Sequence, residues 1–207
     1  MLKSKDEVAL EDLGAGSAVD RTLKRKVSSI ARHSISSHKS CRLISRVARS
    51  RKPKSILELG TSLGISTLYL AHARPESKIY TLEGDPNLAR LAKDNFEKNK
   101  ASNIEVIPGD IDETLPGLLP TLSQVDLAFV DANHTQASTL AYFYALLKKV
   151  NEDSIIILDD IHWSRGMKLA WHEISKHPEV TCSLDLYQVG IIFFKSTLQK
   201  QHWVLHF

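Results

Sequence analysis

Residues 55 to 67 read Ser55-Ile-Leu-Glu-Leu-Gly-Thr-Ser-Leu-Gly-Ile-Ser-Thr67. The apolar residues at the start of this stretch are typical of a buried strand, and Gly60 and Gly64 favour a tight turn before a helix. A strand, a glycine turn and a helix in this order form the place where open α/β sheets bind nucleotide-like ligands. Glu58 is either part of such a site or a side chain that pairs with buried backbone groups.

The composition is that of one globular domain. The chain has 207 residues, of which 43% are hydrophobic and 25% are charged, and its net charge of +3 is too small to imply nucleic acid. Cys41 and Cys182 lack the spacing of a zinc site or a disulfide framework, which fits a reducing compartment. The sequence shows neither a secretory signal nor an apolar run of about 18 residues, so we expect no membrane partner and a cytoplasmic location.

The N-terminal quarter combines a loose segment with two basic helices. Residues 1–20 lack a strand pattern, and Gly14 to Ser17 imitate a cofactor loop but fit a flexible loop or a mobile lid better. Residues 19–51 have helical spacing, and residues 21–54 contain Lys, Arg and His but no acid. These basic residues are solvated helix faces, a patch for an acidic substrate, or a nucleic-acid patch. The last is disfavoured because no aromatic residues are interleaved.

From Pro53 onward, strand and helix patterns alternate, which predicts a parallel sheet with helices on both faces. The segments 180–187 and 189–195 are two β-runs with almost no linker, so they must form a hairpin that adds an antiparallel strand. The tail that follows is apolar and is expected to pack on the body or on a second copy, which makes a homodimer possible. We therefore predict a Rossmann-like α/β fold in one domain, with an N-terminal helical cap (1–52), a core (53–196) and an apolar tail (197–207).

Every predicted parallel strand delivers a carboxylate to the same edge of the sheet. Such a ring would repel a pyrophosphate but suits S-adenosylmethionine, which carries a sulfonium, an ammonium and two ribose hydroxyls. Its one carboxylate fits the start of the first helix, where the helix dipole favours an anion. Some of these acids could instead cap turns or helices. The acids that follow the strands are Glu58, Glu83, Asp110 (after Gly109), Asp131 and the pair Asp159 and Asp160.

The acids after the last two parallel strands raise the possibility of a metal. Asp131, Asp159 and Asp160 are hard oxygen ligands that suit Mg²⁺ and could lower the pKa of a substrate hydroxyl. His134 is placed to act as the general base, or alternatively to precede a helix as a capping residue. Directly after the acid pair, His162 and Trp163 are predicted to line the acceptor pocket, with core packing as the other interpretation.

These motifs resemble those of class I S-adenosylmethionine-dependent methyltransferases, and more narrowly the O-methyltransferases related to the catechol and caffeoyl-coenzyme A enzymes. The runs 56–66, 81–83, 129–134 and 157–160 carry the resemblance. His134 and Asp160 depart from the catechol type, which has Lys and Asn there, and are closer to macrolide sugar O-methyltransferases with a histidine base and Mg²⁺. The resemblance implies the sheet order 3-2-1-4-5-7-6 and the cofactor-binding set Glu58, Gly60, Ser62, Gly64, Ser66, Glu83, Gly109, Asp110, Ile111 and Asp131.

The expected activity is therefore S-adenosylmethionine-dependent methylation of a hydroxyl on a small molecule, with His134 and Asp131 as catalytic residues. Two other functions stay open at this point. The basic N-terminal helices could serve an RNA or protein methyltransferase, although the motif of the amino-methylating enzymes is missing. The chain could also be a cofactor-binding module without turnover, against which the intact set of Asp131, His134, Asp159 and Asp160 argues.

Overall fold

The structure is a computed structural model that describes residues 7–9, 24–33, 37–197 and 199–206. Strands and helices alternate through most of the chain, as the sequence predicted. The strands are β1 (Glu7–Ala9), β2 (Lys24–Lys26), β3 (Ser55–Leu59), β4 (Lys78–Glu83), β5 (Ile104–Pro108), β6 (Leu127–Val130), β7 (Ile155–Leu158), β8 (Cys182–Asp185), β9 (Gly190–Phe193) and β10 (Gln201–Val204). The helices are α1 (Val27–His33), α2 (His38–Arg51), α3 (Ile65–Ala73), α4 (Pro86–Lys98), α5 (Ile111–Leu118), the 3₁₀ helix η1 (Leu119–Thr121), α6 (Gln136–Leu147) and α7 (Arg165–Lys176).

The central sheet has 8 strands in the order β10-β8-β9-β7-β6-β3-β4-β5. Apart from β10, this is the predicted order, and the predicted hairpin places β9 antiparallel to both β7 and β8. The predicted count of seven strands is wrong, because the apolar tail contributes the edge strand β10, parallel to β8. Trp203 and Val204 of β10 remain exposed.

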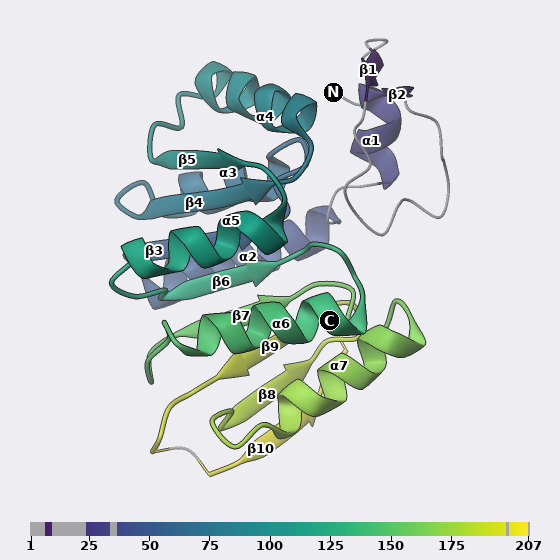
Figure 1. Cartoon of the computed structure of the whole chain (residues 1–207). Coiled ribbons are helices and arrows are strands. Elements are labelled where there is room, and N and C mark those ends of the chain that lie inside the picture. The colour runs from purple at the N-terminus through teal and green to yellow at the C-terminus, as the bar shows by residue number, and fades with distance from the viewer. Residues whose placement is uncertain (1–6, 10–23, 34–36, 198, 207) are drawn as a thin grey trace.

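Helices cover both faces of the sheet (Figure 1). Because side chains alternate along a strand, Leu57 and Leu59 pack towards α5, α6 and α7, while Ile56 packs towards α2 and α3. Ile44 and Ala48 place α2, which belongs to the predicted N-terminal cap, in this second core layer. None of the described helices is both long and apolar enough to cross a membrane.

The β1–β2 hairpin and α1 lie at the end of the fold where the glycine turn follows β3 (Figure 1). Val8, Val27 and Ile30 pack against Leu63 of that turn, and the Asn87 side chain of α4 donates to the Ala9 carbonyl at 3.0 Å. The sequence pattern did not predict these two short strands. The segment from Gly14 to Ser17 lies outside the described residues.

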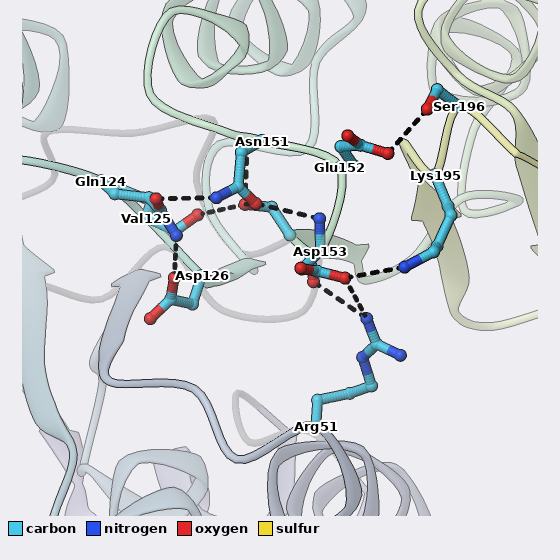
Figure 2. Close-up of polar contacts among 10 residues, drawn as sticks. Arg51, Gln124, Val125, Asp126, Asn151, Glu152, Asp153, Lys195 and Ser196 are labelled. Atoms are coloured by element: carbon cyan, nitrogen blue, oxygen red, sulfur yellow. Dashed lines mark hydrogen bonds and ion pairs between the residues drawn. The ribbon is translucent and has the colours of Figure 1, made fainter.

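Polar contacts join the loops at the opposite edge of the sheet, where the parallel strands begin (Figure 2). Asp153 accepts from Arg51 of α2 at its carbonyl (3.1 Å) and from Lys195 at its carboxylate (3.2 Å). Asp126 accepts the backbone N–H groups of Lys54 (2.7 Å) and Ser55. These contacts tie together the start of β3, the start of β6, the loop before β7 and the segment after β9.

Gly190 in β9 is required by close packing. The indole of Trp171 lies so close that a Cβ on residue 190 would come within 2.6 Å of its ring. Both groups are buried, so a methyl group at this position would displace the ring.

We expect Gly190→Ala to lower the free energy of unfolding by about 2 kcal/mol, as overpacking of a buried site does. Urea denaturation measures the change. The matched control is Gly117→Ala in α5, because nothing lies within 4 Å of a Cβ at that position. Equal stability of the two variants would contradict the packing.

Candidate functional site

The glycine turn after β3 is wedged between the ends of the two neighbouring strands. The Gly60 N–H donates to the Leu82 carbonyl at the end of β4 (3.0 Å). On the other side, a Cβ on Gly60 would lie 2.1 Å from the Asp131 carbonyl oxygen after β6, and φ of Gly60 is +95°. Only glycine fits this close approach at a positive φ. The turn therefore holds Gly60 against the backbone of Asp131.

Glu58 lies beneath the turn and is fully buried. Its carboxylate accepts hydrogen bonds from the hydroxyls of Ser66 (2.6 Å), Thr67 (2.5 Å) and Thr81 (2.6 Å). Burial raises the pKa of Glu58, although the three donors act in the opposite direction. Glu58 and Ser66, both predicted to bind a cofactor, thus bind each other and hold β3, α3 and β4 together from within.

Glu83, at the end of β4, lies beside the tip of the turn. One carboxylate oxygen accepts the Ser62 N–H at 2.7 Å, and the other accepts the Asp85 N–H at 3.0 Å. Burial raises the pKa of Glu83, and these backbone donors oppose that effect. The carboxylate has four lone pairs, and the backbone N–H groups of Ser62, Asp85 and Thr61 use no more than three of them. Glu83 can therefore accept further hydrogen bonds from a ligand that carries hydroxyl groups.

Ser62 supplies an unpaired polar atom at the same place. Its backbone is left-handed (φ 48°), and its buried hydroxyl oxygen has no hydrogen-bond partner within the described part of the chain. Buried polar groups without partners are uncommon and cost free energy. A polar ligand group that meets this hydroxyl would remove that cost.

The loop after β5 borders the same region. The Gly109 N–H donates to the Glu83 carbonyl at 2.9 Å, which holds this loop against the end of β4. Asp110 caps α5 by accepting the Asp112 N–H at 2.9 Å, and Ile111 is buried. Gly109, Asp110 and Ile111 therefore lie together, with the Asp110 carboxylate already used as a helix cap.

Asp131 and His134 follow β6 in a strained loop. The His134 Nε2 atom lies 3.4 Å from an Asp131 carboxylate oxygen, and both side chains are partly exposed. Asn133 and His134 have positive φ values of 58° and 32°, which is unusual for two successive non-glycine residues. The Asn133 side chain donates to the Tyr142 hydroxyl at 2.5 Å and holds the loop in this conformation. Strained backbone conformations of this kind are frequent at functional sites. A histidine beside a carboxylate can also accept a proton.

The predicted metal trio is not assembled. Within the described residues, no three His, Cys, Asp or Glu side chains converge as ligands of a metal ion. Asp159 is buried, whereas Asp160 is partly exposed in a left-handed conformation (φ 54°), with its N–H on the Asp159 carboxylate at 3.1 Å. These two neighbours in sequence thus differ in backbone conformation and exposure, and their role as ligands of an ion stays a prediction.

Cys41, near the start of α2, is buried within reach of the charges of three of the site's acids, which the sequence did not indicate. Burial raises the pKa of its thiol to about 12, and the negative charges of Glu58, Asp159 and Asp131 act in the same direction. The thiol therefore stays protonated and serves as a small buried side chain beside the acids.

His162, a predicted pocket residue, belongs to a cluster around Asp185 that the sequence did not predict. Its Nε2 atom lies 2.8 Å from Asp185, which also accepts the Trp171 indole N–H (3.0 Å) and the Tyr187 backbone N–H (2.9 Å). The Tyr187 ring stacks on the imidazole with ring centroids 5.4 Å apart. Burial would raise the pKa of Asp185, but these donors and the His162 charge outweigh it and lower the pKa.

The cluster leaves two large rings exposed beside it. Trp163 is 64% exposed and Tyr187 is 73% exposed, and both lie in loops that follow carboxyl ends, of β7 and of β8. The sequence did not indicate Asp185 and Tyr187, because they come from a hairpin that is distant from His162 along the chain. A signal was present in the short run 185–190, where an acid precedes the turn of the predicted hairpin.

Comparison with known proteins gives the family. A family model described as a methyltransferase domain matches residues 57–161, which is just over half of the chain. The chain belongs to this methyltransferase-domain family. The resemblance expected from the strand-end motifs is thereby confirmed.

Individual relatives agree with the family. A catechol O-methyltransferase of Niastella koreensis is 30% identical over 118 residues, which is 56% of this chain and 52% of the relative. The structure of the O-methyltransferase TomG of Streptomyces achromogenes, solved in complex with S-adenosylmethionine, is 24% identical, has a TM-score of 0.69 and covers 79% of this chain and 83% of that one. The latter likeness shows a shared fold. The chain spans about half the length or less of the curated relatives it matches.

The raised pKa of Glu58 predicts a pH dependence of stability. Because the folded domain holds the Glu58 proton more tightly than the unfolded chain does, ionisation favours unfolding as the pH rises above the ordinary value of 4.5. We expect the free energy of unfolding to fall less steeply with pH in Glu58→Gln than in the native protein. Urea denaturation between pH 4 and pH 8 measures both slopes. Glu105→Gln, at an exposed residue, is the control, and a Glu58→Gln slope equal to the native one would contradict the account.

Proposed function

We propose that this methyltransferase domain transfers a methyl group from S-adenosylmethionine to a hydroxyl group of a small molecule. The observation that carries the proposal is the pairing of Glu83 with the Ser62 N–H across the tip of the glycine turn. With this pairing, the Glu83 carboxylate can still accept hydrogen bonds, and the buried Ser62 hydroxyl beside it has no partner among the described residues. Both groups lie where the parallel strands end. Family membership supports the same function.

The groups around the turn match the parts of the cofactor. Glu83 would accept the two ribose hydroxyls, and the Ser62 hydroxyl would donate to the methionine carboxylate near the N-terminus of α3. Asp131 would face the ammonium and sulfonium charges. The segment from Gly109 to Ile111 would border the adenine. When bound, S-adenosylmethionine supplies a methyl group that is activated by the sulfonium charge.

In the proposed reaction, His134 would take the proton of the acceptor hydroxyl, and the hydroxyl oxygen would take the methyl group. The carbon–sulfur bond of the donor would break, and its electron pair would leave with the sulfur as S-adenosylhomocysteine. Asp131, 3.4 Å away, orients the imidazole and stabilises the positive charge that it gains. The fixed turn and the strained loop would hold base and donor in line.

We further propose that the aromatic group around His162 forms one wall of the acceptor site. Asp185 fixes the imidazole, and Tyr187 and Trp163 offer exposed ring faces beside it. Such faces suit a flat ring or the apolar face of a sugar. The similarity to a catechol O-methyltransferase of Niastella koreensis makes catechol the first acceptor to test, followed by simple phenols and sugars.

Binding of S-adenosylhomocysteine, measured by isothermal titration calorimetry, tests the proposed function. Glu83→Gln should weaken binding about tenfold or more, because a charged acceptor of the ribose hydroxyls is lost. Glu105→Gln, an exposed change in the neighbouring strand β5, should bind like the native protein. A thermal melt of each variant verifies folding. No binding by the native protein would overturn the proposal.

His134→Ala should lower kcat about 100-fold or more while leaving S-adenosylhomocysteine affinity unchanged, because the base acts only on the acceptor. His206→Ala, at an exposed position, is the control. Mass spectrometry of methylated products from catechol, phenols and sugars gives the rate. Native turnover that survives the His134 change would refute this role, and transfer to no hydroxyl at all would refute O-methylation.

A further inference from the structure

A basic groove runs between α2 and α3, away from the proposed acceptor wall. It encloses about 550 Å³, and Arg42, Arg46 and Arg49 line it from α2 while Tyr69 and His72 line it from α3. Both helices cover the same face of the sheet, opposite α5, α6 and α7 (Figure 1). None of these residues belongs to the proposed cofactor site or to the proposed acceptor wall.

The charge of this groove is uncompensated. Neither α2 nor α3 contains an Asp or a Glu, and the three arginines are exposed. Among the described residues, no carboxylate forms an ion pair with any of the three. A concave wall of unpaired positive charge attracts a polyanion.

The spacing of the arginines places them in a row along α2. Positions 42, 46 and 49 repeat at intervals of four and three residues, so they share one face of α2. With a rise of about 1.5 Å per residue, the guanidinium groups form a row of about 10 Å along the helix. The guanidinium fork pairs with phosphate oxygens in a bidentate manner. A row of three such groups fits successive charges of a phosphodiester chain better than a single anion.

Tyr69 adds an aromatic surface to the same groove. Its ring is partly exposed, and the ring of His38 meets it edge-on with centroids 5.7 Å apart. The basic stretch alone lacks aromatic residues, which is why its sequence disfavoured nucleic acid. The fold supplies the missing ring from α3. Aromatic rings beside a basic track are the surfaces on which unpaired bases stack.

We propose that the α2–α3 groove binds single-stranded nucleic acid, with Arg42, Arg46 and Arg49 on the phosphates and Tyr69 beneath a base. An acidic peptide would use the charges but not the stacking ring, and a flat anionic membrane would not enter a groove. The proposal does not depend on methyl transfer, since it uses no residue of the proposed cofactor site.

The test is fluorescence anisotropy with labelled oligouridylate and oligodeoxythymidylate over a series of salt concentrations. Replacement of the three arginines (Arg42→Ala, Arg46→Ala and Arg49→Ala together) should weaken binding at least tenfold. It should also reduce the slope of log K against log salt by roughly 2, because each neutralised phosphate contributes about 0.7 on a single strand. A preference for one of the two probes would assign the groove to RNA or to DNA.

The matched control removes three exposed charges from α4 (Arg90→Ala, Lys93→Ala and Lys98→Ala together) and should change binding much less. Tyr69→Ala should weaken binding severalfold, and Tyr69→Phe should restore it, as stacking requires. Affinity for S-adenosylhomocysteine should stay native in every variant. Absence of binding to both probes, equal losses in the two triple variants, or binding only to anionic vesicles would overturn the proposal.

Discussion

Three hydroxyl groups donate to the buried carboxylate of Glu58, and the rest of the site depends on that arrangement. Ser66 and Thr67 come from the first turn of α3, while Thr81 comes from β4, directly beside Glu58 in the sheet register. The carboxylate thus joins the strand, the following helix and the neighbouring strand. Because these three elements are fixed to one another, Gly60 packs against the Asp131 carbonyl and the Ser62 N–H donates to Glu83.

The two ends of the parallel strands have different roles. Where the parallel strands begin, the Asp126 carboxylate accepts a backbone N–H group. The Asp153 carboxylate there accepts from the basic side chain of Lys195 (Figure 2). At the opposite edge, Glu83 keeps acceptor capacity, and the pair of Asp131 and His134 stays partly exposed. One edge therefore stabilises the domain, while the other presents groups to a ligand, as open α/β sheets generally do.

Much of this could be predicted because it depends on local patterns. The periodicity of the apolar residues predicted the strands and helices. The ends of the predicted strands indicated the positions of Glu83 and Asp131. The sequence pattern does not show features that depend on neighbours in space or on the local backbone conformation. The role of Glu58 needs Thr81, which lies alongside it only through the sheet register. The left-handed conformation of Asp160, in the acid pair predicted to bind a metal, is likewise not visible in the sequence pattern.

The central claim is that the glycine turn, braced by Glu58 and completed by Glu83, forms the site of the methyl donor. A crystal structure of the protein with S-adenosylhomocysteine tests it most directly. The account predicts both ribose hydroxyls within hydrogen-bonding distance of Glu83, with the carboxylate of the ligand at Ser62. A ligand bound elsewhere, or one whose ribose does not contact Glu83, would contradict it.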